Sequence, residues 1–317
     1  MSRVTRPLAW LTVLACLALG LTLGACATPQ TDFVQQHKDR YPSKAEVADV
    51  PFFAQEDYYC GPAALAMVLA WSGLPVTQEE MAKQVYTPGR KGTLQTDILA
   101  AARRNGRLAF SVHSLPEILA EIDKGHPVLV FQNLGFDWYP EWHYAVAIGY
   151  DLDAGTIRLH SGLDARQDLD LTVFERTWRR AGHWARVILP PDQLPVAVDE
   201  KTAVEAATSL ARVKQQADAA TAFSTIAKRW PRSFVAYIGL GNARYALKQW
   251  AAAEQAYRAA IVLSPGTASA WNNLAYALAK QGRRSDAVDA ARKAVVLGGA
   301  NNADYKDTLK ELSAGGL

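Results

Sequence analysis

Residues 55–67 read QEDYYCGPAALAM, and this stretch decides the fold because it places Cys60 where an apolar helix begins. Pro62 follows in the first turn, where proline is tolerated, so we predict a helix over residues 60–71. The first N–H groups of a helix lack intrahelical partners, and the helix dipole favours an anion beside them. This position predicts a lowered thiol pKa and a nucleophilic role for Cys60, although an arbitrary free cysteine is more often buried and inert.

The N-terminus has the features of an export signal. Two arginines precede an apolar run at residues 8–23, which is shorter than the roughly 20 residues of a membrane-spanning helix. The run ends in LGAC at residues 23–26, and this motif resembles the lipobox of bacterial lipoproteins. The resemblance implies that residues 1–25 are a signal peptide and that the thiol of Cys26 is acylated. Ala27 after it implies an outer-membrane lipoprotein that faces the periplasm.

The remaining composition narrows the classes of partner. If Cys26 is acylated, Cys60 is the one free thiol left after removal of the signal peptide. Residues 26–48 are polar and are expected to form a tether. The chain has a formal net charge of +3, with neither a basic run among aromatic residues nor Cys and His at metal-ligand spacing. We therefore expect a membrane anchor through the lipid, and no nucleic-acid partner, metal or cofactor.

Gln55, followed by YCGPA at residues 59–63 and an apolar helix, resembles the start of the C39-type (bacteriocin-processing) cysteine peptidases. This resemblance spans residues 49–191 and implies an α+β papain-like cysteine peptidase domain. In that family the cysteine is the nucleophile and the glutamine lines the oxyanion hole, so the resemblance implies these roles for Cys60 and Gln55. It also implies a peptide or protein substrate. Predicted helices precede predicted strands along the segment, which independently favours an α+β fold.

The general base is sought among six histidines. His143 and His183 each begin a predicted strand beside a tryptophan. We favour His143, because the hydrophobic strand that it opens, residues 143–150, resembles the strand of the family's histidine. The implied reaction is attack of the Cys60 thiolate on a peptide carbonyl, with His143 protonating the leaving amine.

The residue behind His143 departs from the family pattern, in which an aspartate ends the next strand. Pairing the two predicted strands about their turn places Ser161 opposite His143, so Ser161 is the expected partner of the imidazole. A serine fixes the tautomer without supplying charge. Asp164 folding back, or a Cys–His pair alone, remains an alternative. Asp151 lies eight residues along the strand from His143, roughly 26 Å away, and is too far to orient the ring.

Residues 133–142 hold four aromatic side chains among glycine, aspartate and proline, and they are expected to form a loop. Two interpretations stay open for this loop. It is either packed on the surface or one wall of a substrate groove, since binding pockets are largely apolar and aromatic. The second interpretation assigns substrate contacts to Trp138, Tyr139 and Trp142.

The C-terminal part is a separate domain, which follows a predicted linker at residues 192–204. Its composition is rich in alanine, and a proline or glycine recurs every 34 residues, which is the tetratricopeptide period. The resemblance is carried by Tyr237, Leu240, Gly241, Ala253, Tyr257, Ala260 and Pro265. It implies an all-α TPR helical repeat domain over residues 205–315. By analogy of fold alone, its inner groove would bind a peptide or protein partner through Asn242, Asn272 and Asn273.

The leading functional prediction is a lipid-anchored cysteine endopeptidase with a repeat domain for partner or substrate binding. Two alternatives use the same fold: a catalytically weak or inactive scaffold in an envelope complex, and an acyl or amide transferase with the same Cys–His chemistry. The missing aspartate favours the scaffold, whereas the retained Gln55, Cys60 and His143 favour an enzyme. The chain has no Walker-type Gly-Lys-Ser/Thr loop, so we expect no ATP partner.

Overall fold

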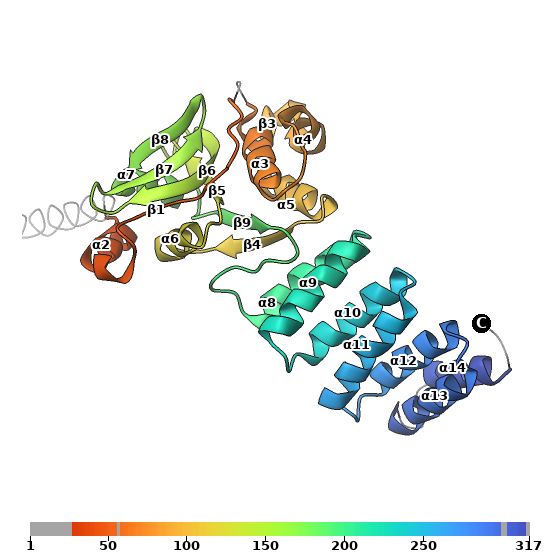
Figure 1. Ribbon diagram of the computed structural model, residues 1–317. Helices are drawn as coiled ribbons and strands as arrows, with labels where there is room; N and C mark the ends of the chain where they lie inside the picture. Colours follow the sequence, from red (N-terminus) through yellow and green to blue (C-terminus); the bar gives the residue numbers. More distant parts are fainter. Residues whose placement is uncertain (1–26, 56–57, 299–302, 315–317) are drawn as a thin grey trace, which may run out of the picture.

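The computed structural model describes residues 27–55, 58–298 and 303–314, which form an α/β domain followed by an array of helices (Figure 1). This arrangement confirms the predicted α+β domain and the predicted all-α repeat domain. The predicted signal peptide and Cys26 lie outside the described residues. Among the helices that are described, none combines the length and the apolar character needed to cross a membrane.

An antiparallel sheet of seven strands forms the centre of the first domain. Its order is β4-β9-β5-β6-β7-β8, and β1 pairs with β6 beyond the end of β5. The strands are β1 (Lys44–Glu46), β4 (Leu108–Val112), β5 (Val128–Asn133), β6 (Trp142–Asp151), β7 (Thr156–Ser161), β8 (Asp164–Asp170) and β9 (Ala185–Leu189). A separate two-stranded hairpin is formed by β2 (Tyr86–Thr87) and β3 (Gly92–Thr93).

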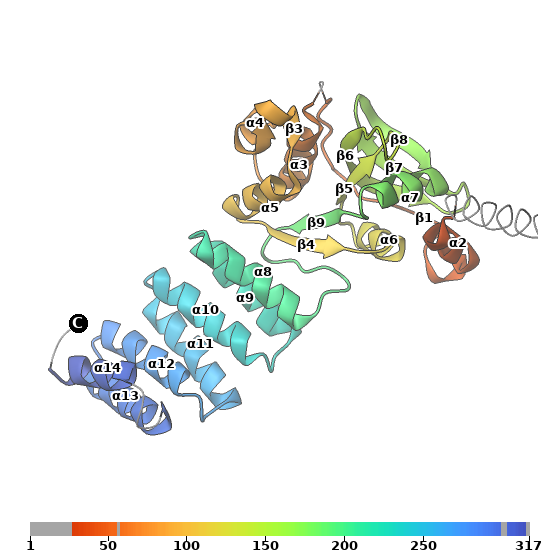
Figure 2. The ribbon, with the colours of Figure 1, turned by 180° about the vertical axis from the view of Figure 1, so that it is seen from behind.

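Helices cover both faces of the sheet. Successive side chains of a strand point to opposite faces, so each strand contributes to two apolar clusters. On β6, Tyr144 and Val146 share an apolar cluster with α3 (Cys60–Trp71), α4 (Gln78–Val85) and α5 (Gln95–Arg104). Ala145 and Ala147 join the opposite cluster, which includes α2 (Pro29–Gln36), α6 (Leu115–Asp123) and α7 (Leu171–Arg180). Figure 2 shows α7 lying across the sheet.

Helix α3 has the predicted bounds and is buried on all sides from Gly61 to Leu69. A helix that is apolar all round belongs in a core rather than on a surface. The next helix, α4, begins with a capping box: the Thr77 hydroxyl accepts from the Glu80 N–H at 3.2 Å, and the Glu80 carboxylate accepts from the Thr77 N–H at 2.9 Å. Helix α3 is therefore fixed within the domain, and its first residue is fixed with it.

The predicted tether at residues 26–48 is wrong for most of its length, because the segment folds onto the domain. Helix α2 is held through the Glu175 carboxylate, which accepts from the backbone N–H groups of Gln30 at 3.1 Å and Thr31 at 2.7 Å. Val34 is fully buried, and β1 continues the pairing that β5 makes along the same edge of β6. The polar composition misled the prediction, since a few buried contacts and one carboxylate suffice to order this segment.

The predicted register of the β6–β7 hairpin is also wrong. His143 was expected opposite Ser161, but the pairing begins at Val146 with His160 and shifts at a bulge between Ala147 and Gly149. The strands already pair as Asp151 with Thr156 beside the turn, so the predicted register is wrong from there onward, and the bulge shifts it by one residue. The chain then turns into β8, a strand that the sequence analysis missed, and α7 follows it directly.

The helices of the second domain stack in pairs along the array (Figure 1). They are α8 (Glu200–Arg212), α9 (Gln216–Arg229), α10 (Phe234–Ala246), α11 (Trp250–Leu263), α12 (Ala268–Lys280), α13 (Arg284–Gly298) and α14 (Ala303–Ala314). Helix α8 begins inside the predicted linker, because the Asp199 carboxylate caps it by accepting from the Thr202 N–H at 2.7 Å. The linker is accordingly shorter than 192–204.

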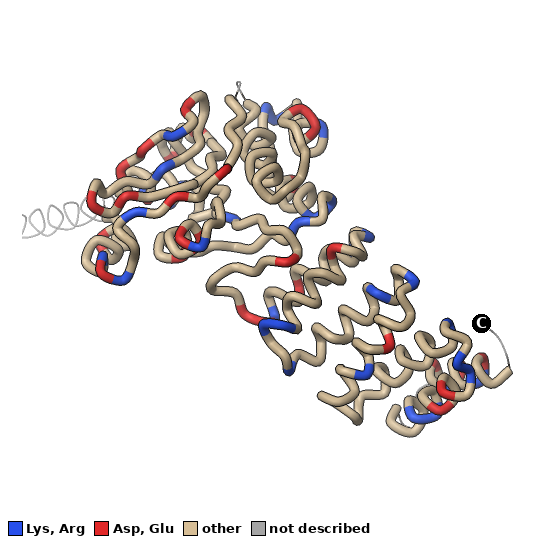
Figure 3. Tube along the Cα trace, viewed as in Figure 1, with Lys and Arg blue, Asp and Glu red and all other residues tan. Residues whose placement is uncertain are grey.

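The two domains share one continuous apolar cluster. Ala207 of α8 belongs to the same buried cluster as Leu108 of the sheet. The connecting segment is fixed to both sides, since the Val196 N–H donates to the Glu121 carboxylate at 2.7 Å. The Arg229 guanidinium donates to the carbonyl of Val196 at 2.9 Å. Figure 3 shows acidic and basic residues interspersed along the trace of both domains.

The buried carboxylate of Glu175 provides a test of how the N-terminal segment is held. We expect Glu175→Ala to lower the free energy of unfolding by about 2 kcal/mol or more, because two N–H groups lose their acceptor. Asp32→Asn on the exposed side of α2 should cost less than about 1 kcal/mol. Urea unfolding followed by circular dichroism measures both. Equal effects of the two substitutions would show that α2 is not anchored through Glu175.

Candidate active site

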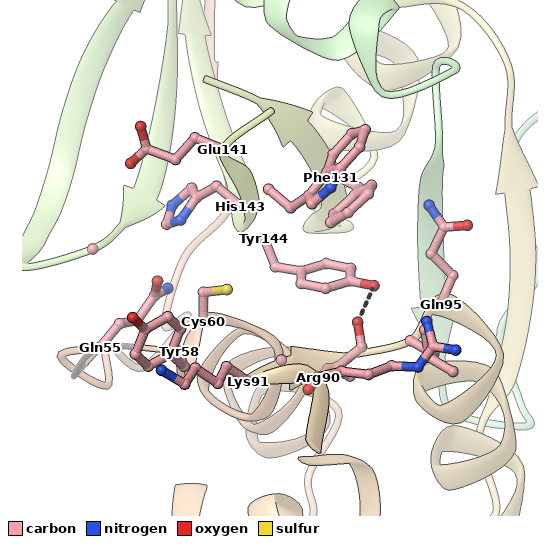
Figure 4. Close-up of a pocket in the computed structure, with 15 residues that line it drawn as sticks. Gln55, Tyr58, Cys60, Arg90, Lys91, Gln95, Phe131, Glu141, His143 and Tyr144 are labelled. Carbon is pink, nitrogen blue, oxygen red and sulfur yellow. Dashed lines mark hydrogen bonds between the residues drawn. The ribbon is translucent and has the colours of Figure 1, made fainter. Parts of the chain in front are cut away.

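A pocket of about 700 Å³ lies where the start of α3 meets the start of β6 and the β2–β3 hairpin (Figure 4). Its lining includes Gln55, Cys60 and His143, the three residues to which the sequence analysis assigned the main chemical roles. Trp142, a predicted substrate contact, also lines it. Trp138 and Tyr139 do not, and stand on the exposed loop next to it. The fold thus gathers the predicted reactive groups from segments that are distant in sequence.

Cys60 is the first residue of α3, and its N-cap Tyr59 stacks on Tyr86 of the hairpin with ring centroids 4.9 Å apart. Burial raises the pKa of the Cys60 thiol above its ordinary value. Backbone N–H groups of Tyr144, Gly61 and Cys60 itself act in the opposite direction, but they do not outweigh the loss of hydration. The expected lowering of this pKa by the helix start is therefore wrong in the unliganded protein.

His143 is held by Ser161, as predicted, although the register that suggested this contact is wrong. Its Nε2 lies 3.0 Å from the Ser161 hydroxyl oxygen. This contact leaves Nδ1 for the pocket. Burial lowers the pKa of His143 below its ordinary value, and the Glu141 carboxylate opposes this only in part. A buried imidazole with a neutral partner is therefore uncharged near neutral pH.

The alternative partners and bases lie elsewhere. Asp151, at the far end of β6, is paired with Lys44 at 2.8 Å. Asp164 is an exposed residue that pairs through its backbone with Ser161 and makes no contact with the imidazole among the described residues. The ring of His183 packs edge-on against Trp178, with centroids 4.6 Å apart, outside the pocket.

Gln55 is 7% exposed, and neither its amide oxygen nor its amide nitrogen has a partner among the described residues. Its backbone N–H donates to the Gly162 carbonyl at 3.0 Å, which ties it to the turn after Ser161. A buried amide without partners costs free energy unless a ligand supplies them. Figure 4 shows this side chain beside Cys60 at the pocket. It is suited to donate to an oxygen of a bound molecule.

The sequence analysis missed several residues of the pocket. The hydroxyl of Tyr144 donates to the Thr93 carbonyl at 3.2 Å, and the Thr93 side chain packs so closely on Gly61 that a Cβ there would lie 2.5 Å from it. The alternation of β6 could have identified Tyr144, since it places residues 142 and 144 on the face of α3. The contact of Gly61 with Thr93 has no signal in the sequence.

Two further lining residues, Tyr58 and Lys91, have positive φ angles of 68° and 46°. The Lys91 ammonium lies over the Tyr58 ring, 5.5 Å from its centroid. Such conformations are unusual for non-glycine residues and cluster at functional sites. Another missed residue, His160, supports the segment before Gln55 by placing its Nε2 3.1 Å from the Val50 carbonyl oxygen. Residues 50–54 of that segment are not part of a strand.

The resting site is an uncharged thiol beside an uncharged imidazole. Among the described residues no hydrogen bond joins Cys60 to His143, and Figure 4 shows the sulfur directed toward Tyr144. In the part of the chain that the structure describes, no group of three or more His, Cys, Asp or Glu side chains could hold a metal ion. The chemistry available is therefore nucleophilic attack by a thiol whose proton is removed by a neighbouring base.

The pH dependence of alkylation tests the uncharged pair. We expect the rate at which iodoacetamide modifies Cys60 to rise in a single step above the ordinary thiol pKa of about 8.5, because burial raises that pKa. Peptide mapping after each reaction isolates the signal of Cys60, and urea-unfolded protein supplies the unshifted reference. A plateau of reactivity between about pH 4 and 8, as a thiolate–imidazolium pair gives, would contradict this assignment.

The contact with Ser161 predicts how the imidazole responds to charge. Ser161→Asp should raise the pKa of His143 above its ordinary value of about 6.5, because a carboxylate within hydrogen-bond distance stabilises the imidazolium. Ser161→Ala should give no such rise. Titration of the imidazole by NMR measures both without reference to activity. If the aspartate variant left the pKa unchanged, residue 161 would not be the partner of His143.

Comparison with known proteins supports the same division of the chain. Residues 47–185 match the family model described as "Peptidase_C39 like family", and residues 241–282 match the model described as "TPR repeat". Comparison with curated proteins gives no match.

Solved structures resemble each part separately. A C39-like peptidase from Bacillus anthracis is 18% identical, with a TM-score of 0.40, over 47% of this chain and 98% of that one. The Arabidopsis OM64 TPR domain is 21% identical, with a TM-score of 0.35, over 37% and 95%. A MamA RS-1 double mutant is 23% identical, with a TM-score of 0.35, over 37% of this chain and 65% of that one. On the two family matches, the chain joins a domain of the C39-like peptidase family to tetratricopeptide repeats.

Proposed function

We propose that the protein is a cysteine endopeptidase in which Cys60 is the nucleophile and His143 is the general base and acid. The observation that carries this proposal is the amide of Gln55 beside Cys60, which has no hydrogen-bond partner among the residues that the structure describes. A purely structural glutamine at that depth would be expected to use its amide within the protein. An amide held ready for an oxygen, next to a thiol and an imidazole, suits acyl transfer.

In this mechanism the proton moves as the carbon–sulfur bond forms, because both groups start uncharged. The imidazole of His143 accepts the proton of the Cys60 thiol while the sulfur attacks the peptide carbonyl. The oxygen of the tetrahedral intermediate accepts from the Gln55 amide and the Cys60 backbone N–H, and one such donor is worth about 3 kcal/mol. The imidazolium then protonates the leaving amine. Water, activated by the neutral imidazole, hydrolyses the thioester.

Ser161 holds the imidazole of His143 in one orientation throughout this reaction. It stabilises the charge of the imidazolium only weakly, since a hydroxyl stabilises that charge less than a carboxylate does. This feature supports a second candidate, a catalytically weak scaffold in an envelope complex. An acyl or amide transferase would follow the same reaction as far as the thioester. It would differ from a peptidase only in the group that then attacks the thioester.

From the sequence, we also propose where the protein is anchored and what kind of partner it binds. The lipobox-like LGAC motif supports acylation of Cys26 and anchoring in the outer membrane, facing the periplasm. The repeats support protein–protein interaction in general. In the proposed groove, the Asn242 side-chain oxygen accepts from Tyr257 at 2.9 Å and Asn273 at 3.1 Å, and the buried oxygen of Asn272 has no partner among the described residues. These amides suit the backbone of a bound peptide.

Cleavage assays on a mixture of peptides test the proposed function. We expect Cys60→Ala to abolish cleavage and Gln55→Ala to lower kcat by about 10²–10³-fold, because the oxyanion loses a donor. Gln95→Ala is the matched control, since Gln95 also lines the pocket but stands away from Cys60 (Figure 4). New termini located by mass spectrometry show which bonds break.

The same assay separates the alternatives. Full cleavage by Cys60→Ala would exclude this mechanism, and no cleavage by the wild-type protein would favour the scaffold. An added amine that appears in the products in place of water would identify a transferase.

A further inference from the structure

The turn of the β2–β3 hairpin presents two positive charges to the candidate active site. Arg90 ends a short 3₁₀ helix between the two strands, and Lys91 follows it. Both residues are exposed, and both line the pocket. Among the described residues, no carboxylate forms an ion pair with either side chain. The two charges are therefore not neutralised within the described part of the chain.

The charges of the pocket are unevenly distributed. Glu141 is the one carboxylate among the described lining residues. Figure 4 shows Glu141 beside His143 on one side of Cys60, and the side chains of Arg90 and Lys91 on the other side. The hairpin side of the pocket is therefore positive. A cleft wall that carries one sign of charge attracts ligands of the opposite sign.

The hairpin is fixed to the helix that carries Cys60. Strand β3 supplies Thr93, whose side chain packs closely against Gly61 in the first turn of α3. Strand β2 supplies Tyr86, whose ring stacks on Tyr59, the N-cap of α3, with centroids 4.9 Å apart. The backbone of the turn is therefore held in place relative to the nucleophile. A charge on such a support binds a partner at a lower entropic cost than a charge on a mobile loop.

The side chain of Lys91 is also positioned locally. Its ammonium lies over the ring of Tyr58, 5.5 Å from the ring centroid, and Tyr58 lines the pocket as well. An ammonium has three N–H donors, and contact with a ring face occupies only one side of it. Donors of Lys91 therefore remain available to an anionic group of a bound molecule.

We propose that Arg90 and Lys91 select substrates that carry an aspartate or glutamate side chain close to the scissile bond. This inference rests on the proposed peptidase function and adds a substrate class to it. A guanidinium binds a carboxylate through two parallel N–H donors, and an ammonium contributes a point charge. A basic substrate residue would instead meet like charges at the hairpin. Neither residue takes part in the bond-making steps assigned to Cys60 and His143.

A matched peptide series tests the inference on the full chain. A peptide that the protein cleaves is resynthesised with aspartate, asparagine or lysine at successive positions on both sides of the scissile bond, and kcat/KM is measured for each. At one position or more, we expect aspartate to be favoured over asparagine about fivefold or more at low ionic strength, and lysine to be disfavoured. The preference should decrease in about 0.5 M salt, because exposed charges are screened.

Charge reversal separates recognition from damage to the fold. Arg90→Glu/Lys91→Glu should favour lysine over asparagine at the same positions, and a misfolded site could not acquire that preference. Arg90→Gln/Lys91→Gln should bring the aspartate-to-asparagine ratio close to one. The control Lys83→Gln/Lys124→Gln removes the same charge from exposed residues of α4 and the end of α6, outside the pocket. It should leave the ratio unchanged.

The outcomes distinguish this inference from the proposed function. Equal kcat/KM values for the aspartate and asparagine peptides at every position would overturn the inference and leave the peptidase function standing. So would a preference for aspartate that survives in Arg90→Gln/Lys91→Gln, or one that the control variant loses to the same extent. Absence of any cleavage by the wild-type protein would overturn both.

Discussion

The site depends on the packing of the first turn of α3 against the start of β6. Helix α3 is buried on every side, so Cys60 cannot move without disturbing the core. The close contact of Gly61 with Thr93, and the hydrogen bond from Tyr144 to the Thr93 carbonyl, tie the helix to both the hairpin and the strand. This packing brings Cys60, His143 and Gln55 to one pocket from three segments.

The same packing sets the electrostatics of the site. Removing water from Cys60 and His143 raises the pKa of the thiol and lowers the pKa of the imidazole, and the N–H groups of the helix start do not compensate for the thiol. The charges that the proposed reaction requires are therefore absent at rest and would develop during that reaction. An oxyanion formed next to Gln55 would meet an amide that has no competing partner among the described residues. Once a bound substrate excludes water, such a preorganised donor acts most strongly where charge appears.

Much of this fold could be predicted from local patterns. The start of α3 and the 34-residue period of the repeats are signals within short stretches, and each prediction is confirmed. The β-bulge, the folded α2–β1 segment and the contact of Gly61 with Thr93 depend on distant partners, so composition and spacing could not show them. Ser161 was predicted through a wrong register: it lies beyond the last β6–β7 pair and contacts His143 through its side chain. The expected thiol pKa failed for a related reason, since burial is a property of the whole domain.

The central claim is that, below its pKa, the uncharged thiol becomes nucleophilic only when a peptide places its carbonyl between Gln55 and His143. Its most direct test is intact-protein mass spectrometry after reaction with a peptidyl chloromethyl ketone at about pH 6, below the ordinary thiol pKa. The account predicts one covalent adduct, mapped to Cys60, in the wild-type protein, and none in His143→Ala over the same time. An adduct that forms equally fast in His143→Ala, or no adduct at Cys60 in the wild-type protein, would contradict the account.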